Sequence, residues 1–393
     1  MPDEAPSARG PLAAFAAFGV FWGAWGVLLP AIKEQTGASI GELGIALLFV
    51  AAAALPSMLA TGVLLDRFGL RLVALSVAFF GLAVLLPGFV HSVWALALVL
   101  VVVGAGSGAL DVSINVAASS VEAARCVRLM QKAHAFFSGG FLLGSGLTGL
   151  ARAAGAGPRP ILLGASATLL AAAWLNRGAS RVPAPAAPGG RRLRFSKTLV
   201  ALGVLCAVAF VVESGIEHWS ALFLETELDA SPGVGALGPA FFAVAMVLGR
   251  LAGQRYEERV GDVVLLAGGA SVAAAGLTLA AMAPSLPLAV TGFFLGGGGI
   301  SVAAPTLFGA AGRTAAEAER GSSIASVTTV SYLGFLSGPP LIGAVSGALD
   351  LRAGIGLLAA IALLLALASS SFGRALPLRR LQPAPRGRLS QPG

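Results

Sequence analysis

Charged residues are scarce in this chain, and their scarcity excludes an ordinary soluble protein. Asp, Glu, Lys and Arg make up 11% of the 393 residues, whereas a soluble domain carries about 25%. Hydrophobic residues make up 56% of the chain, and the mean hydropathy is +0.87. We therefore expect a protein whose partner is the lipid bilayer, crossed many times by apolar helices.

Cysteine and histidine are also rare, which argues against a disulfide framework and against a metal site. The two cysteines, Cys126 and Cys206, fall in an expected loop and inside an expected helix, so they provide no disulfide framework. The three histidines are far apart in the sequence and show no metal-ligand spacing. No nucleophile stands beside a base. We expect no metal, no cofactor and no enzymatic activity.

Long apolar runs dominate what remains. A spanning helix needs about 20 apolar residues, and breaks at charges or at Pro/Gly clusters then predict twelve spans. This is an all-α integral membrane fold of two six-helix bundles. The first span has no small-residue cleavage site after it, so we expect a retained helix and not a signal peptide. The expected spans are 11–32, 40–63, 72–90, 93–118, 132–153, 160–176, 198–224, 235–253, 263–283, 287–311, 323–347 and 353–372.

The basic residues orient these spans. With both termini in the cytoplasm, 22 of the 26 Lys and Arg residues fall on the cytoplasmic side. Only Lys33, Arg152, Arg159 and Arg352 fall outside. The positive-inside rule therefore predicts cytoplasmic termini, and frequent Ala, Gly and Arg point to a bacterial inner membrane. The net charge of +8 thus requires no nucleic-acid partner.

The longest polar break separates two halves. Pro and Gly recur in it, as in a flexible linker. We expect a monomer with a cytoplasmic N-terminal tail (1–10), an N-terminal bundle (11–176), a cytoplasmic linker (177–197), a C-terminal bundle (198–372) and a disordered cytoplasmic tail (373–393).

The two halves repeat each other. A shift of 192 residues aligns the loops that follow the second span of each half. Parallel repeats of this kind are a transporter architecture. The second half has Ala303 where the first half has the acid Asp111. The aligned loop positions are Asp66 with Glu258, Arg67 with Arg259, and Gly69 with Gly261.

Asp111 is the one acid of the N-terminal half that no helix end can expose. A carboxylate near the centre of a membrane helix costs about 2.5–3.5 kcal/mol on insertion scales. Gly104, Gly108, Asp111 and Asn115 share one helical face, which we expect to form the wall of a polar cavity. Asp111 is our first candidate for proton coupling and Asn115 a candidate for substrate contact. The alternatives are a helix-packing acid and an interhelical hydrogen bond.

The span 198–224 carries two further acids on one face. At ~1.5 Å per residue, Glu213 lies about 22 Å and Glu217 about 28 Å from the start of the helix. Glu213 is therefore our second proton-coupling candidate. Glu217 is expected either to contact substrate or to lie solvated at the mouth of the cavity.

The loop at 62–71 has the most specific pattern. It reads Gly-x-x-x-Asp-Arg-x-Gly-x-Arg and resembles the signature loop of the major facilitator superfamily, although Leu70 stands where a second basic residue is usual. The resemblance implies a twelve-helix transporter in which this loop and its repeat act as a conformational latch. Topogenic charge is the alternative. The latch residues are then Gly62, Asp66, Arg67, Gly69 and Arg71, with Glu258 and Arg259 in the repeat.

Other segments resemble the fucose-permease-like branch of proton:sugar symporters. These are Leu110-Asp111-x-x-x-Asn115, His134 to Gly139, Pro305 to Phe308, and Tyr332 to Pro340. The resemblance implies proton-coupled uptake of a small, sugar-like molecule. One departure is that residues 21–26 contain no acid, whereas those symporters have one in the first helix. Their two-acid mechanism is therefore not carried over whole.

A sugar-like substrate makes aromatic and hydroxyl residues candidates for binding. Trp22, Trp25 and Trp219 could stack on a sugar ring, or they could pack within the protein or anchor it at the membrane interface. Ser138 adds a hydroxyl. Two other functions stay open. The first is proton-coupled export of amphipathic compounds, which the few intramembrane charges favour. The second is a non-transporting membrane receptor or enzyme, which no motif favours.

Overall fold

The computed structural model describes residues 7–125, 129–177, 196–314 and 320–372. These residues form helices and no strand, which confirms the all-α integral membrane fold. In the first half the helices are α1 (Arg9–Thr36), α2 (Ile40–Phe68), α3 (Arg71–Ala83), η1 (Leu86–Phe89), α4 (Val93–Arg125), α5 (Met130–Ala153) and α6 (Pro158–Asn176). In the second half they are α7 (Lys197–Glu227), α8 (Pro232–Gly235), α9 (Leu237–Ala281), α10 (Leu286–Ile300), α11 (Ala303–Arg313), α12 (Arg320–Ala348) and α13 (Leu351–Phe372).

Ten segments of the described residues are long and apolar enough to cross a membrane. They include both parts of α9, and they include α10 and α11 taken together as one span. The helices α5 and α12 are not among them, although the sequence predicts spans there. Both helices line the cavity between the two halves. Both helices also carry many glycine and hydroxyl residues, which lower their hydropathy. Two of these glycines, Gly144 and Gly334, lie against the backbones of α1 and α7.

The internal repeat appears in the backbone. Gly69 ends α2 with φ 66° and ψ −162°. Gly261, its partner at a shift of 192 residues, bends α9 with φ 76° and ψ 160°. Both angles lie where residues with a Cβ are strained. The two halves thus make the same sharp bend between their second and third spans, and glycine is required at both bends.

Glycine also sets how closely the helices approach within the first half. A Cβ on Gly104 would lie 2.0 Å from the Val50 carbonyl oxygen of α2. A Cβ on Gly144 would lie 2.1 Å from the Val20 carbonyl oxygen of α1. These contacts are the close packing of helices through small residues that is common in membrane proteins. They fix α4 against α2 and α5 against α1, which positions the residues that face the centre of the molecule.

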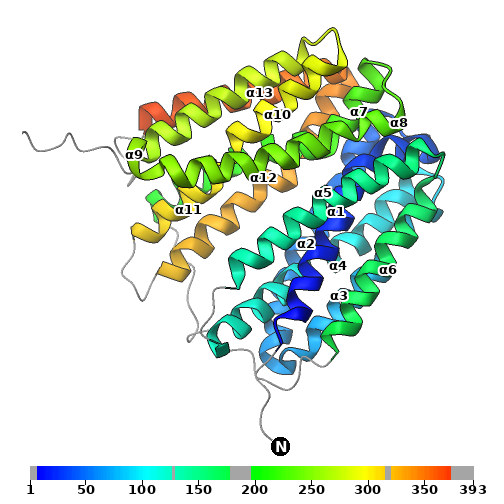
Figure 1. The fold of residues 1–393 in the computed structure, drawn as a ribbon, viewed down its shortest axis with the longest axis vertical. Coiled ribbons are helices and arrows are strands. Elements are labelled where there is room, and N and C mark those ends of the chain that lie inside the picture. Colours follow the sequence, from blue (N-terminus) through cyan, green and yellow to red (C-terminus); the bar gives the residue numbers. More distant parts are fainter. Residues whose placement is uncertain (1–6, 126–128, 178–195, 315–319, 373–393) are drawn as a thin grey trace, which may run out of the picture.

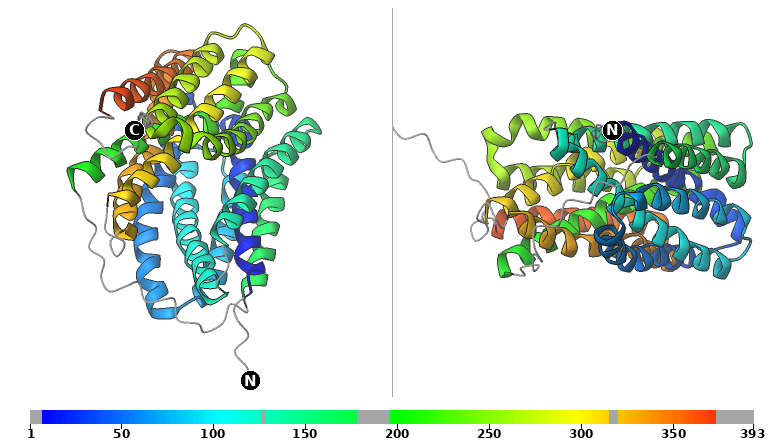
Figure 2. Two further views of the ribbon diagram at one scale, coloured as in Figure 1. Left: turned by 60° about the vertical axis from the view of Figure 1, so that its left-hand side comes forward. Right: turned by 90° about the horizontal axis from the view of Figure 1, so that it is seen from below.

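The helices form two groups, α1–α6 and α7–α13, that meet mainly near one end. We define the sealed end as the end with the turns 37–39, 154–157, 228–231 and 349–350. We define the basic end as the opposite one, with Arg9, Arg67, Arg71 and Arg313. Figure 1 shows the groups converging where α1, α5, α7 and α8 meet and separating toward α11, and Figure 2 shows the same arrangement from two further sides.

Backbone contacts close the seam between the groups at the sealed end. A Cβ on Gly343 of α12 would lie 2.6 Å from the Cα of Gly44 of α2. A Cβ on Gly347 would lie 2.9 Å from the Cα of Gly41, one turn further on. Because the contacts join backbone to backbone, any larger residue at Gly44, Gly343 or Gly347 would push the two halves apart.

A buried ion pair reinforces this seal. Arg152 of α5 and Glu225 of α7 bind through two parallel hydrogen bonds, of which the one from Nη2 to Oε2 measures 2.9 Å. The Arg152 Nη1 also donates to the Val27 carbonyl oxygen at 2.9 Å. The side chains are 6% and 13% exposed. A charge-assisted, two-pronged contact therefore links three helices across the seam.

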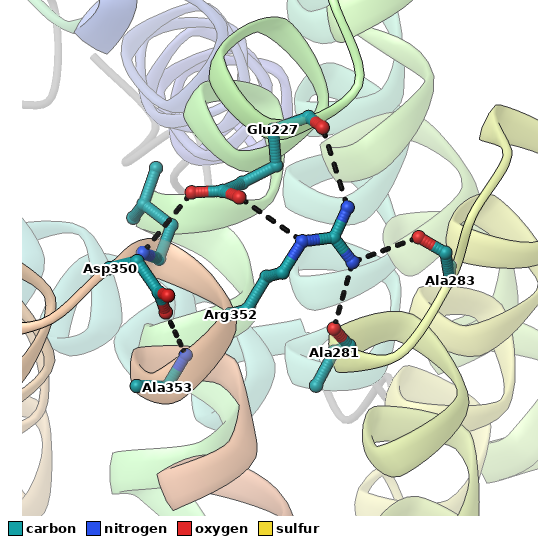
Figure 3. A network of polar contacts seen from close by, with 7 residues as sticks. Glu227, Ala281, Ala283, Asp350, Arg352 and Ala353 are labelled. Carbon is teal, nitrogen blue, oxygen red and sulfur yellow. Dashed lines mark hydrogen bonds and ion pairs between the residues drawn. The ribbon is translucent and has the colours of Figure 1, made fainter.

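A second arginine ties together the sealed end of the second half (Figure 3). Arg352 of α13 pairs with Glu227 of α7 at 3.1 Å and donates to the carbonyl oxygens of Ala281 and Ala283 at 3.1 and 2.9 Å. Glu227 also accepts a hydrogen bond from the backbone nitrogen of Leu351. These contacts join α7, α9 and α13 at this end of the second half.

Candidate functional site

A cavity of about 680 Å³ lies between the two halves. The first half lines it with α1, α2, α4 and α5, and the second half with α7, α9, α11 and α12. The lining runs from Glu217 and Trp22 toward Gly253 and Gln254 of α9. It therefore extends from below the seal toward the basic end. Phe, Leu, Val, Ala and Met make up most of its wall.

Asp111 lies on this wall and joins the two halves. Its Oδ2 accepts a hydrogen bond of 3.1 Å from the hydroxyl of Tyr332, which comes from α12 of the second half. Its Oδ1 accepts one of 3.1 Å from the side-chain amide of Asn115, one turn further along α4. Gly108 and Asp111 line the cavity, whereas Gly104 faces α2 and Asn115 is not part of the lining. Asn115 thus orients the carboxylate of Asp111 in this conformation and does not reach the cavity.

Glu213 and Glu217 line the opposite wall, four residues apart on α7. Glu213 pairs with Arg250 of α9, with 3.5 Å between Oε1 and Nη2. Glu217 borders the same cavity near the seal, so it does not lie at a solvated mouth in this conformation. The three carboxylates named by the sequence therefore face one space.

The first half adds aromatic and polar groups. Trp22 lines the cavity and packs edge-on against His218 of the second half, with 6.2 Å between ring centroids. Ser138 lines it as well, and its hydroxyl donates to the carbonyl oxygen of His134 at 3.1 Å. The His134 ring lies 5.3 Å from that of Phe15. Trp22 and Ser138, two of the binding candidates, thus line the cavity.

Trp25 and Trp219 are placed differently. They are 1% and 0% exposed and do not line the cavity. Trp25 stacks on Phe21, with 5.9 Å between ring centroids. In this conformation both indoles are packing residues, which is the alternative that the sequence left open. Helical periodicity predicts which face of the helix a tryptophan lies on. It does not predict whether that face meets a cavity or a neighbouring helix.

The residues of the loop at 62–71 lie at the basic end. Asp66, Arg67 and Arg71 are exposed. Arg67 lies over the ring of Phe68, with 5.4 Å from its guanidinium carbon to the centroid. No ion pair joins Asp66 to another residue in the described part of the chain. In the repeat Arg259 is exposed, and the side chain of Glu258 lies outside what the structure describes. The neighbouring Asp262 pairs with Arg313.

Two residues of the site have a role that sequence reasoning missed. Arg250 was counted among the charges of the cytoplasmic loops, yet it lines the cavity and faces Glu213. The internal repeat could have indicated this role. A shift of 192 residues aligns Arg250 with Met58 of the first half, and Met58 also lines the cavity. Tyr332 was noted only as part of a family motif. Its contact with Asp111 joins residues 221 positions apart and leaves no local pattern.

No group of three His, Cys, Asp or Glu side chains in the described residues could hold a metal ion. The site can therefore be described by its carboxylates, its arginine and its aromatic wall. A cavity between two pseudo-repeated helix bundles, with ionisable groups at mid-depth, is the arrangement found in secondary transporters.

Comparison with known proteins decides the family. The family model described as Major Facilitator Superfamily matches residues 12–272 and 218–391. The chain belongs to the major facilitator superfamily. It is a membrane transport protein and not an enzyme.

A relative and two solved structures agree with this membership. An uncharacterized MFS-type transporter of Yersinia pestis is 32% identical over 365 residues, which cover 92% of this chain and 94% of the relative. A mutant of the nucleoside transporter NupG has a similar fold, with a TM-score of 0.76 at 13% identity, covering 92% of this chain and 99% of NupG. A bacterial homolog of the human lysosomal transporter Spinster, in an inward-facing and occupied conformation, has a TM-score of 0.75 at 15% identity, covering 96% and 98%.

Proposed function

We propose that this superfamily member takes up a small, polar, sugar-like molecule together with protons by alternating access. The observation that carries the proposal is the hydrogen bond between Asp111 of one half and Tyr332 of the other, inside the cavity. Protonation of Asp111 changes its carboxylate from a pure acceptor into a group that also donates. A proton at this position therefore alters a contact between the two moving parts, which is what coupling requires. The fucose-permease-like segments of the sequence support the same substrate class.

The proposal is tested in two steps. Purified protein is first screened for ligand-induced thermal stabilisation with sugars, sugar acids and amphipathic drugs, because a ligand that binds the folded state raises its apparent stability. The compound found is then offered to proteoliposomes across an imposed pH step. Accumulation that follows the pH step supports proton coupling. Equilibration without accumulation contradicts it.

One observation favours a second function, proton-coupled export of amphipathic compounds. The cavity wall is mostly apolar and includes Phe210, Phe308 and Phe335. Stabilisation by amphipathic drugs together with no effect of any sugar or sugar acid would favour export over uptake.

The proposed orientation places the basic end in the cytoplasm of the bacterial cell. It is supported by the distribution of Lys and Arg between the two ends, and it makes the present conformation open to the cytoplasm. A reporter fused after Gly393 should be active only as a cytoplasmic fusion, and one inserted after Lys33 only as an external one. An external signal from the C-terminal fusion would reverse the topology.

The domain limits are part of the same proposal. The tail 1–10 and the bundle 11–176 precede a linker at 177–197, and the bundle 198–372 precedes a tail at 373–393. Residues 1–6 of the first tail, 178–195 of the linker and 373–393 lie outside the described residues. We also propose that the protein acts as a monomer, since each chain holds a complete cavity between its own two halves.

The loop at 62–71 is proposed as a latch that closes the basic end in the opposite conformation. With the cavity extending toward the basic end, Asp66 is exposed and forms no ion pair with any described residue. Asp66→Asn should therefore leave folding and ligand affinity nearly unchanged while it slows transport, because it destabilises the closed state of the basic end. Exposed charge pairs contribute about 0.2–1 kcal/mol, so we expect the rate to decrease by a factor of about 1.4 to 5.

The measurement is uptake rate in proteoliposomes beside ligand affinity in detergent. Arg255→Gln is the matched control, because Arg255 is an exposed charge of α9 outside the cavity lining. Equal transport rates in Asp66→Asn and the parent would leave Asp66 with a topogenic role alone.

A further inference from the structure

Arg250 is the one arginine or lysine that lines the cavity in the described part of the chain. Its side chain is 41% exposed although it lies between two helix bundles. A guanidinium in such a place has five N–H donors to satisfy. The hydrogen-bond acceptors around Arg250 therefore indicate whether its guanidinium can also bind a ligand.

The contact of Arg250 with Glu213 is loose. The closest approach is 3.5 Å, whereas a charge-assisted hydrogen bond between nitrogen and oxygen measures about 2.7–2.9 Å. No hydrogen bond by Arg250 to any described residue accompanies it. Arg152 and Arg352 differ. Arg152 donates hydrogen bonds to its carboxylate, Arg352 pairs with its carboxylate at 3.1 Å, and both donate to nearby carbonyl oxygens. Glu213 thus balances the charge of the Arg250 guanidinium but leaves its N–H donors available for a further hydrogen-bond acceptor.

The residues around Arg250 and Glu213 could accommodate a small molecule with a ring or a short carbon chain. Phe210, one turn before Glu213 on α7, packs on Phe335 with 4.5 Å between centroids. Phe335 in turn neighbours Tyr332, at 6.3 Å, which holds Asp111. Within one cavity, the rings of Phe210 and Phe335 therefore lie between the Arg250 guanidinium and the hydrogen-bonded pair of Tyr332 and Asp111. A molecule with a carboxylate at one end and hydroxyl groups at the other matches this order.

We infer that Arg250 binds the carboxylate of the transported molecule, which makes the substrate class a sugar acid or a similar hydroxy-carboxylate, and that Glu213 competes with the substrate for the same guanidinium. This inference rests on the proposed function, because it takes the cavity as the substrate site. When Glu213 accepts a proton, its negative charge disappears and Arg250 is left as an unbalanced cation. The substrate carboxylate then restores neutrality. When the proton leaves, Glu213 recovers Arg250 and the substrate is displaced.

Other titratable groups surround the exchange and belong to its pH dependence. Glu217 and His218 line the cavity from α7, His134 from α5, Asp111 from α4 and Tyr332 from α12. The buried Cys206 lies seven residues before Glu213 on the same helix. Asp111 already has two hydrogen-bond donors of its own, so the competition for Arg250 is assigned to Glu213.

The first experiment measures thermal stabilisation of the full-length protein in detergent by matched probes. The pairs are D-galacturonate with D-galactose, D-glucuronate with D-glucose, and D-gluconate with D-glucitol. We expect a rise in Tm with one or more of the acids and none with its neutral counterpart. Arg250→Gln should abolish the rise, Arg250→Lys should retain part of it, and the control Arg255→Gln should retain all of it. Equal shifts by acid and neutral probe, a shift that survives in Arg250→Gln, or no shift with any acid would overturn the inference.

The second experiment tests the role of Glu213 and remains informative even if Arg250→Gln does not fold. If one proton must bind Glu213 for each carboxylate bound, Kd of the stabilising acid rises about tenfold per pH unit once Glu213 is deprotonated. Glu213→Gln imitates the protonated state, so its Kd should stay at the low-pH value of the parent at high pH. An unchanged slope in Glu213→Gln would remove the competition. Because binding is measured without a gradient, a failure of proton-driven uptake would contradict the proposed function and leave this inference standing.

Discussion

Asp111→Asn should abolish uphill accumulation while leaving a folded protein that still binds its substrate. The asparagine keeps one oxygen and one amide group where the carboxylate has two oxygens, so contacts to Asn115 and Tyr332 remain possible. It cannot take up and release a proton. For one proton per substrate, a pH step of one unit drives up to about tenfold accumulation in the parent. We expect a ratio of 1 in the variant. The proton on Glu213 should not restore accumulation, because without the Asp111 proton the empty carrier can return with Glu213 still protonated.

Three variants measured together make this result interpretable. Asp111→Ala should lose more than Asp111→Asn, because both hydrogen bonds of the carboxylate disappear. Asn115→Ala is the matched control, since it removes one neutral hydrogen-bond partner of Asp111 and leaves the carboxylate. The assay is accumulation in proteoliposomes after an imposed pH step, with downhill counterflow as the measure of intact binding. Accumulation by Asp111→Asn would move the coupling proton to Glu213 or Glu217 on α7.

Much of the fold could be predicted because membrane helices follow simple rules. Apolar length locates spans and basic residues alternate between sides, so the sequence predicts the helices at 11–32 or 263–283 with small errors at their ends. The capping box at Ser39 and Glu42 was also predictable, and both of its hydrogen bonds are present. Local patterns of this kind depend on residues within one turn of each other.

The pairings across the two halves could not be predicted from one sequence. Asp111 with Tyr332 and Arg152 with Glu225 join residues 221 and 73 positions apart, and no local periodicity encodes such distances. The sequence reasoning placed Arg152 among the few external charges without a partner. What the sequence did show was that Asp111 is unusual, because a lone intramembrane acid requires a compensating contact.

Breaking the ion pair between Arg152 and Glu225 should shift the protein toward the conformation that is open at the sealed end. Arg152→Gln or Glu225→Gln leaves one buried charge without its partner, and removing one partner of a buried pair costs about 3–5 kcal/mol. Opening the sealed end exposes the remaining charge to water and removes that penalty. The equilibrium between the two conformations should therefore move by about two to four orders of magnitude. Substrate uptake should fall by at least tenfold.

The double variant Arg152→Met with Glu225→Met distinguishes this mechanism from simple unfolding. It places apolar side chains on both sides of the seam, so no buried charge is left and the seal should recover much of its stability. Accessibility at the sealed end is measured with a cysteine at Ala236, which is 4% exposed and faces Gly149 of the other half, labelled by a membrane-impermeant maleimide. A cysteine at Gln254 on the cavity wall is labelled in detergent. The single variants should become more reactive at the sealed end and less reactive at Gln254, and the double variant should return toward the parent. Equal labelling in the parent and both single variants would show that the glycine contacts of Gly44 with Gly343 and Gly41 with Gly347 hold the seal without the ion pair.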